Sequence, residues 1–233
     1  MRVSRFYFTV IIMSTLYVVA TPIGNLKDIT LRALEVLKEV DLILAEDTRV
    51  TKKLLSHYEI SKQVISYHEY SGKGMEEKIL KFLGEGKNLA LVVDAGTPGI
   101  SDPGQRLIKR LATEGVEILP IPGPSALSAI VSVSDINLSE FLFLGFPPHK
   151  KGRQKFFKKV AESAVPVVLY ESTHRIIKTL KELQGACGDR YANIGRELTK
   201  VYEEIFRGKF SEAEGHFVGE KVRGEFVIVI DTK

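Results

Sequence analysis

The sequence predicts an α/β protein with two domains, each a mixed or parallel sheet with flanking helices. Short apolar runs alternate with amphipathic segments of helical length. Such alternation is typical of βαβ units around a parallel sheet. The pattern becomes less regular near residues 120–125, which indicates a domain boundary there. A chain of 233 residues is long enough for two such cores.

Five apolar runs are the expected strands of an N-terminal domain over 13–123. They are 16–20, 41–45, 63–67, 89–93 and 116–119. Asp28 and Thr48 stand where a side chain caps the N-terminus of a helix. The helices expected at 75–83 and 105–112 each run toward a glycine, a typical helix stop.

The C-terminal domain is expected over 124–233. It begins with a helix near 124–133 and has another at 173–185. Its spacing indicates fewer parallel units and some hairpins. The expected strands are 141–146, 166–170, about 191–196 and 225–230.

The first twenty residues carry two arginines, an apolar run and a closing alanine, as a secretory signal does. We reject that interpretation because cleavage there would remove 15–20, the expected first strand. Met13 is the expected start, and residues 1–12 are then an optional extension. No second long apolar stretch follows, so we expect a cytoplasmic protein without a membrane span.

The composition excludes several classes of protein. An apolar fraction of 44% and a charged fraction of 27% argue against disorder. The net charge of +4 permits an anionic partner without requiring one. The single cysteine, Cys187, excludes an intrachain disulfide and a cysteine-rich metal site.

Common nucleotide-binding and hydrolytic motifs are absent. The stretch SGKGMEEK has Glu77 where a dinucleotide-binding fingerprint needs its third glycine. The stretch GEGKN has Asn88 where a Walker loop needs serine or threonine. There is no H-E-x-x-H, no G-x-S-x-G and no histidine cluster, and no metal ion is expected.

Three loops rich in glycine and proline leave expected strands at their carboxyl ends. They are DAGTPGISDPG at 94–104, ATPIGNLKDIT at 20–30 and PIPGPSAL at 120–127. Ligands of open α/β sheets bind at this edge, and glycine lets the backbone approach a ligand closely. The loops therefore predict a small-molecule site built largely from backbone. The alternative for 94–104 is a tight structural turn.

Six blocks resemble one family, in order, from Leu16 to near the end of the chain. They are LYVVATPIGNLKDITLRALEVLKEVDLILAEDTRVTKKLL, DAGTPGISDPG, PIPGPSAL, YESTHRI, RELTKVYEE and RGEFVIVI. The chain resembles the ribosomal RNA small subunit methyltransferase I family, part of the tetrapyrrole methylase superfamily of class III methyltransferases. Two departures stand out. The family usually has serine where Val93 stands, and many members carry a further C-terminal segment, so any RNA contact made there must be absent or replaced.

The resemblance implies a class III fold with S-adenosylmethionine in a cleft between the two domains. It also implies a homodimer that methylates the ribose 2′-hydroxyl of a decoding-centre cytidine in 16S rRNA, within the small ribosomal subunit. The residues it implies for cofactor binding are Pro22, Asp94, Gly96, Thr97, Pro98, Ile100, Ser125, Ala126, Tyr170 and Leu198.

The polar blocks of the resemblance hold the candidate catalytic residues. A ribose hydroxyl is a weak acid, so methyl transfer needs a base or a cation beside it. The candidates are Glu46, Asp47, Arg49 and Lys200, with Glu171, His174, Arg175, Arg196 and Glu197 in the same blocks. The alternative for the AEDTR block is a surface cluster of ion pairs with a helix cap, and His174 is more simply a structural histidine.

The stretch HKKGRQKFFKK at 149–159 has six basic residues and no acidic one. Phosphate neutralisation is the functional interpretation. The predicted RNA contacts are Lys150, Lys151, Arg153 and Lys155. The alternative is a solvated helix face.

Two other functions remain possible at this point. One is a methyltransferase of the same superfamily that acts on a small tetrapyrrole. The other is a regulatory module that binds a nucleotide without catalysis.

Overall fold

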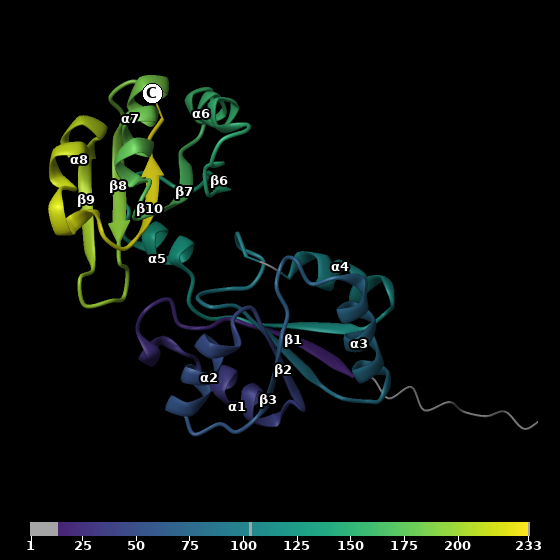
Figure 1. Cartoon of the computed structure of the whole chain (residues 1–233). Helices are drawn as coiled ribbons and strands as arrows, with labels where there is room; N and C mark the ends of the chain where they lie inside the picture. Colours follow the sequence, from purple (N-terminus) through teal and green to yellow (C-terminus); the bar gives the residue numbers. More distant parts are fainter. Residues whose placement is uncertain (1–13, 103, 233) are drawn as a thin grey trace, which may run out of the picture. The chain divides into compact units, whose positions relative to one another are not determined.

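The computed structural model of the protein describes residues 14–102 and 104–232, so the proposed extension at 1–12 lies outside the described residues. The chain forms two compact units (Figure 1). Unit 1 contains residues 14–21 and 29–123, and unit 2 contains residues 22–28 and 124–232. The short segment 22–28 therefore belongs to unit 2, although it lies early in the chain.

Unit 1 is built on a five-stranded sheet with the order β3-β2-β4-β1-β5. Every pairing in this sheet is parallel. The strands are β1 Thr15–Val19, β2 Leu42–Ala45, β3 Gln63–Ser66, β4 Leu89–Val92 and β5 Glu117–Ile121. The connecting helices are α1 Leu31–Glu39, α2 Thr48–His57, α3 Lys73–Gly84 and α4 Gln105–Thr113.

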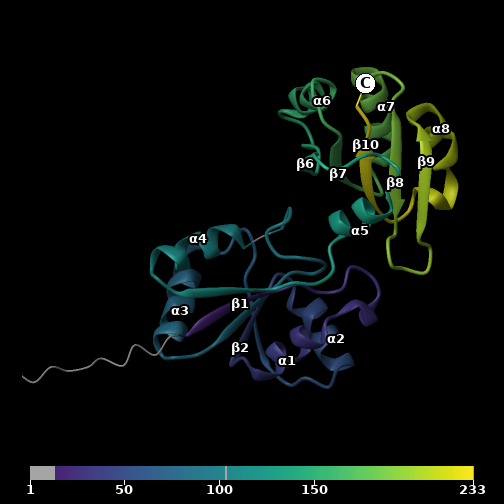
Figure 2. The same cartoon turned by 180° about the vertical axis from the view of Figure 1, so that it is seen from behind.

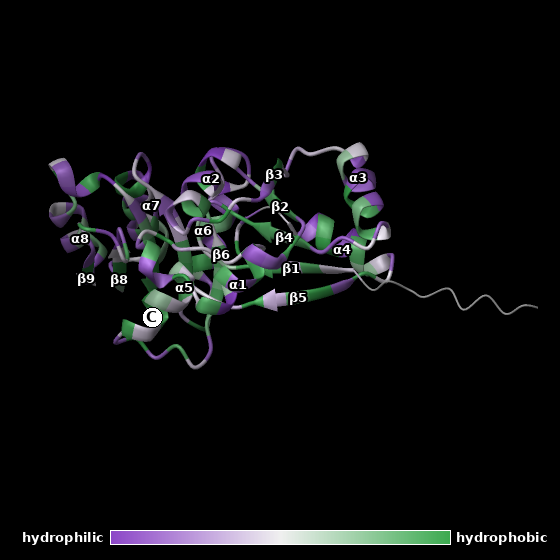
Figure 3. Ribbon diagram, turned by 90° about the horizontal axis from the view of Figure 1, so that it is seen from below, coloured by the Kyte–Doolittle hydropathy of each residue, from purple (hydrophilic) through white to green (hydrophobic). Residues whose placement is uncertain are grey.

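The strands of unit 1 bury both faces of the sheet. In β2, Leu42 and Leu44 pack in the core formed with α3 and α4. Ile43 and Ala45 point to the opposite face and pack against α1 and α2. This two-residue alternation explains why the strands are almost continuously apolar. Figure 3 shows α3 with both green and purple patches, as expected of a helix with one buried face.

Two helix caps differ from the sequence prediction. Thr30, rather than Asp28, caps α1 and accepts a hydrogen bond from the Ala33 backbone at 3.1 Å. Asp47, rather than Thr48, caps α2. In both cases the cap is the residue with extended backbone that directly precedes the first helical residue. Asp28 instead ends a short 3-10 turn.

Unit 2 has a mixed five-stranded sheet with the order β6-β7-β10-β8-β9. Only β6 and β7 pair in parallel. The strands are β6 Leu142–Gly145, β7 Val167–Ser172, β8 Tyr191–Arg196, β9 Glu204–Lys209 and β10 Glu225–Ile230. The helices are α5 Ala126–Val133, α6 Arg153–Ala161, α7 Ile176–Cys187 and α8 Phe210–His216. The α/β fold class is confirmed, with hairpins in unit 2 as expected and β9 in addition.

Strand β10 lies in the middle of the unit 2 sheet, between β7 and β8 (Figure 2). Its side chains alternate between the two faces of the sheet. Phe226, Ile228 and Ile230 pack with α6, α7 and α8 on one face. Val227 and Val229 pack with α5 on the other face, where Ile23 of the 22–28 segment joins them. The second face is the one that carries the predicted cofactor residues of this unit.

Candidate functional site

The carboxyl edge of the unit 1 sheet brings the predicted acidic block and the first glycine-rich loop together. Strands β2 and β4 are neighbours, so Glu46 and Asp47 lie beside Asp94. The Asp47 backbone N–H donates to the Asp94 carboxylate at 3.0 Å. The Asp94 N–H in turn reaches Glu46 Oε2 at 3.5 Å. Three carboxylates from two separate segments thus form one cluster.

The loop that follows β4 is fixed at its start. Thr21 and Gly96 exchange two backbone hydrogen bonds of 2.9 and 3.0 Å. The Thr21 hydroxyl also donates to the carbonyl of the buried Val93 at 3.0 Å. Gly96 has φ of +85°, a conformation that favours glycine. The backbone after Asp94 is therefore held in a defined shape.

The rest of this loop is also internally bonded. The Ile100 N–H donates to the Thr97 carbonyl at 3.3 Å. The Gln105 side chain donates to the Gly99 carbonyl at 3.1 Å, and Pro98 is buried between these turns. The loop is an ordered surface of backbone groups, as its glycine and proline content predicts.

The adjacent carboxylates Glu46 and Asp47 differ in basicity. Arg49 donates to Asp47 from Nε at 3.0 Å and from Nη2 at 2.6 Å, and these bonds hold the pKa of Asp47 at about 2. Burial raises the pKa of Glu46, and the charges of Asp94 and Asp47 add to this effect. Burial also raises the pKa of Asp94. Glu46 is therefore the stronger base of the predicted pair.

A hollow of about 760 Å³ opens beside Glu46. Segments that follow β2, β3 and β4, together with the start of α4, line it. The lining residues are Glu46, Tyr67, His68, Glu69, Tyr70, Gly99, Ser101, Asp102, Gly104, Gln105 and Arg106. Glu46 was predicted by name, and Gly99, Ser101, Asp102 and Gly104 lie in the loop 94–104 that was predicted to form a ligand site. The residues at 67–70 and the start of α4 were not predicted. The cluster of aromatic residues in SYHEYSG, directly after the strand at 63–67, was the available signal.

In unit 2, the predicted cofactor residues gather around the first turn of α5. The Tyr170 hydroxyl accepts a hydrogen bond from the Leu127 N–H at 3.1 Å. Tyr170 and Ala126 pack in the same apolar core as Leu198. Ser125 directly precedes the helix and is 8% exposed, and its side chain makes no capping hydrogen bond. Pro22 begins the 22–28 segment and is buried.

Lys200 is held as a cation. Its ammonium group donates to Glu197 at 2.8 Å and to Glu225 at 3.0 Å. Burial lowers the pKa of Lys200, but these carboxylates outweigh burial and the net shift is upward. The side chain also lies against Gly24, where a Cβ would stand 2.3 Å from Lys200 Cγ. Lys200 is therefore suited to stabilising negative charge and unsuited to accepting a proton.

Other polar residues of the same blocks are used within unit 2. Glu171 is 1% exposed, pairs with Arg175 at 2.8 Å and accepts from the Thr179 hydroxyl at 2.6 Å. Arg196 donates to the Arg223 carbonyl at 2.7 Å. These contacts connect the sheet to its neighbouring segments and indicate a structural role.

The basic run 149–159 divides into exposed and buried residues. Lys150, Lys151 and Lys155 are exposed. Arg153 is 6% exposed and its guanidinium donates to Glu182 at 2.9 and 2.5 Å, to Thr179 and to the Pro148 carbonyl. The predicted RNA contact is therefore wrong for Arg153, because its donors are engaged inside unit 2.

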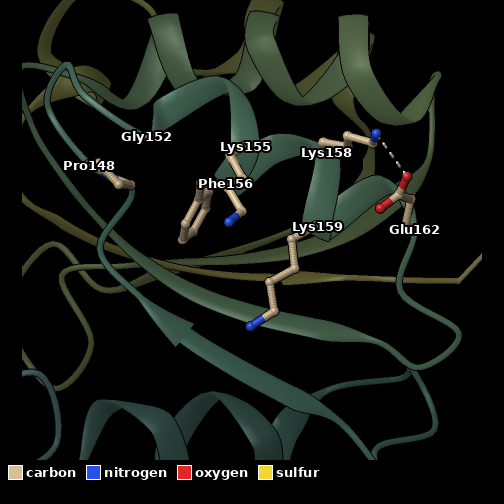
Figure 4. Close-up of a pocket in the computed structure, with 7 residues that line it drawn as sticks. All are labelled: Pro148, Gly152, Lys155, Phe156, Lys158, Lys159 and Glu162. Carbon is tan, nitrogen blue, oxygen red and sulfur yellow. Dashed lines mark ion pairs between the residues drawn. The ribbon is translucent and has the colours of Figure 1, made fainter.

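The exposed face of α6 borders a second hollow, of about 550 Å³ (Figure 4). Lys155 extends beside the Phe156 ring, and Lys159 lies along the same hollow. Lys158 also lines the hollow, and its ammonium group pairs with Glu162 at 3.6 Å. Lys159 was not among the predicted contacts, although it lies one helical turn after Lys155 in the same run.

Two kinds of feature are absent from residues 14–102 and 104–232. Within them, no group of three or more histidine, cysteine, aspartate or glutamate side chains is arranged to hold a metal ion. None of the helices described there has both the length and the apolar character that crossing a bilayer requires.

The fold and the glycine-rich edge define a class of methyltransferases. Residues 15–214 match the family model of the Tetrapyrrole (Corrin/Porphyrin) Methylases. Two solved structures show the same fold. Cobalt precorrin-4 methyltransferase has a TM-score of 0.70 at 20% identity and covers 93% of this chain and 94% of its own. A diphthine synthase has a TM-score of 0.72 at 16% identity, with coverage of 94% and 90%.

Within this class, the chain belongs to the ribosomal RNA small subunit methyltransferase I family. The relative from Thermotoga maritima is 47% identical over 95% of this chain and 100% of its own length. The relative from Borrelia garinii is 47% identical over 92% of this chain and 97% of its own. The one from Bacillus subtilis is 43% identical over 94% and 75%.

Proposed function

We propose that the protein transfers a methyl group from S-adenosylmethionine to the 2′-hydroxyl of a cytidine in the rRNA of the small ribosomal subunit. The general activity, methylation of rRNA, is supported by relatives of 40–47% identity that carry the name ribosomal RNA small subunit methyltransferase I. The cofactor, the 2′-hydroxyl and the cytidine are our extension from the family resemblance and the residues of the site.

The residues present fit the proposed cofactor. Asp94, Gly96 and Thr97 present an ordered backbone with polar groups suited to hydroxyl, amine and carboxylate partners. Ser125 offers a hydroxyl that is not used for capping, beside Ala126. We propose that both sets, with Pro98, Ile100, Pro22, Tyr170 and Leu198, contribute to binding. When bound, S-adenosylmethionine supplies an electrophilic methyl group on its sulfonium.

One observation carries the mechanism: Glu46 is the carboxylate of the acidic block whose pKa is raised, and it lines an open hollow. We propose that Glu46 accepts the proton of the 2′-hydroxyl as the ribose oxygen attacks the methyl group. A base needs a pKa not far below the working pH. The pKa of about 2 makes Asp47 a poor base, so its role is to cap α2 and orient Arg49.

The basic groups have two separate roles in this proposal. The Arg49 side chain is 86% exposed although it pairs with Asp47, so it is placed to contact a phosphate. Lys200 stabilises negative charge as an ammonium ion. Lys150, Lys151, Lys155 and Lys159 neutralise phosphates of the RNA along α6 and the loop before it.

We also carry the homodimer and a cytoplasmic location into the proposal, because the family resemblance implies the first and a ribosomal substrate requires the second. The test is transfer of labelled methyl from S-adenosylmethionine to small subunits that lack the modification, followed by mapping of the labelled nucleotide. A 2′-O-methylcytidine is expected. Cofactor binding without transfer to rRNA would instead favour a regulatory binding module.

A further inference from the structure

We propose that the hollow of about 760 Å³ beside Glu46 binds the unstacked base of the nucleotide that is methylated, and that it selects a base with an exocyclic amino group. This inference rests on the proposed function, since it assigns a subsite for the same RNA. The volume lies within the range of pockets that hold small molecules, about 300–1,000 Å³.

The first support is an aromatic side chain presented to solvent at the hollow. Tyr70 is 87% exposed, whereas Tyr67, three residues earlier, is 2% exposed. The His68 ring lies next to the Tyr70 ring, with centroids 6.3 Å apart. Exposed rings of this kind stack on unpaired bases in proteins that bind single-stranded nucleic acids.

The second support is that the segment carrying Tyr70 is already ordered. The Tyr70 N–H donates to His68 Nδ1 at 3.2 Å. The Ser71 N–H donates to the His68 carbonyl at 2.8 Å, and the His68 N–H donates to the Ser71 hydroxyl at 3.0 Å. The Tyr67 N–H also donates to the Ala45 carbonyl at 2.8 Å. The backbone that carries the ring is therefore ordered before a base binds, and only the side-chain torsions of Tyr70 remain to be fixed.

The third support is the charge of the lining. Glu46, Glu69 and Asp102 are carboxylates, and the one basic residue fixed among them, Arg106, already bonds Glu76 at 2.6 Å and the Ser71 carbonyl. Such a lining disfavours a phosphate. Carboxylates do accept hydrogen bonds from exocyclic amines such as cytosine N4. An amino-bearing base thus fits both the rings and the acidic lining.

The position of Glu46 identifies which nucleotide occupies the hollow. The residue proposed to accept the 2′-hydroxyl proton is itself part of the lining. A nucleotide whose base lies in this hollow therefore places its own ribose near Glu46. In this inference the acidic hollow of unit 1 binds the base and ribose of the nucleotide. The lysine-lined hollow of unit 2 binds phosphates of the RNA.

The experiment uses the full chain and a short single-stranded oligoribonucleotide that carries 2-aminopurine, whose fluorescence is quenched by stacking. Wild-type protein should quench it. Tyr70→Ala should abolish the quenching and weaken binding about tenfold, whereas Tyr70→Phe keeps a ring and should behave as wild type. Tyr202→Ala, at another highly exposed tyrosine, is the matched control. Free cytidine should displace the probe at lower concentration than uridine.

The outcomes separate this inference from the proposed function. Quenching that survives in Tyr70→Ala, or is lost equally in Tyr202→Ala, would overturn the stacking pocket. Equal displacement by cytidine and uridine would overturn the amino-group selection. In parallel, Tyr70→Ala should raise KM for small subunits without a matching fall in kcat. If wild-type protein methylates small subunits and Tyr70→Ala does so with the same KM, only the pocket fails. If wild-type protein transfers no methyl group to small subunits, the proposed function fails as well.

Discussion

The two hollows of the molecule are built in different ways. The hollow in unit 1 is formed by segments that follow β2, β3 and β4, and backbone hydrogen bonds connect several of them. The hollow in unit 2 is lined largely by one face of α6, with lysine side chains and Phe156. The first is an acidic surface with aromatic rings, and the second is a basic surface of long side chains.

The two hollows are suited to different tasks, base selectivity in unit 1 and RNA affinity in unit 2. Long lysine side chains neutralise phosphates in any sequence and depend on salt. A pocket of fixed rings and carboxylates distinguishes one base from another. We therefore expect substitutions in unit 1 to change what is methylated and how fast. Substitutions on the face of α6 should change how tightly RNA binds.

The largest expected effect is on stability, and it compares the buried Arg153 with the exposed Lys150 of the same basic run. Arg153→Ala removes a buried guanidinium and leaves Glu182 and Thr179 without their partner. Breaking a fully buried ion pair costs about 3–5 kcal/mol. Because the Glu182 side chain is 32% exposed, we expect a loss near the lower end of that range. Chemical denaturation of the full chain, followed by circular dichroism, should show this loss. The exposed Lys150→Ala should change stability by less than about 0.5 kcal/mol. Similar small losses in both would return Arg153 to the RNA surface.

The next effect is on the rate of methyl transfer, and it compares Glu46 with Asp47 in unit 1. Glu46→Gln should slow single-turnover methyl transfer by about a hundredfold or more, because it removes the base. Asp47→Asn should stay within a few-fold of wild type, because asparagine still caps α2. As pH is lowered, Glu46 becomes protonated and the wild-type rate should fall. Because the pKa of Glu46 is raised, this fall should begin at a higher pH than for a glutamate with the ordinary pKa. A hundredfold loss in Asp47→Asn with normal Glu46→Gln would reverse the assignment.

A smaller effect is expected on RNA affinity. Lys155→Glu with Lys159→Glu should weaken binding and reduce the slope of log affinity against log salt by about 1.5 to 2. The cofactor should bind as before. The matched control is Lys178→Glu with Lys181→Glu, two exposed lysines on α7 of the same unit. Equal losses in the two double variants would mean that net charge, and not the face of α6, decides affinity.

The smallest effect concerns stability at low pH. The Asp47 carboxylate has a pKa of about 2 in the folded chain against 3.8 for an ordinary aspartate. Its charge therefore stabilises the folded state fully above the ordinary value, and this contribution disappears as pH falls to about 2. The difference in denaturation midpoint between wild type and Asp47→Asn should narrow over that range. A difference that stays constant would mean that the pair with Arg49 adds nothing.

Much of the fold was predictable because strand and helix periods are local. The sequence pattern missed β9, whose residues EIFRGK mix charged and apolar side chains at the edge of the sheet. The two caps were misplaced because Asp28 and Thr30, or Asp47 and Thr48, satisfy the same rule. Arg153 was predicted to be exposed because it belongs to a run of basic residues, and such runs are usually solvated, but its side chain is buried. Its spacing with the buried Phe157 and Val160 already matched a buried helical stripe.

The site was predictable as a set of segments but not as a set of roles. The AEDTR and DAGTP blocks follow neighbouring strands, so their proximity follows from the topology. The difference in pKa between Glu46 and Asp47 depends on the contact of Asp47 with Arg49 and on the burial of Glu46. The Tyr70 ring belongs to no motif, and Lys159 ends the basic run with nothing in the sequence to separate it from its neighbours. Their places beside the two hollows depend on the tertiary structure.

The membership of 22–28 in unit 2 has a consequence for the order of folding during synthesis. The Asn25 N–H donates to the Thr199 hydroxyl across a separation of 174 residues. Ile23 packs with Val227 and Val229 of β10, the last strand among the described residues. Contacts of such high sequence separation form slowly. Unit 1 has all its strands once residue 121 has been synthesised. The segment 22–28 can make its contacts with β10 only after residues 225–230 have been synthesised. A fragment beginning at residue 124 would lack this segment.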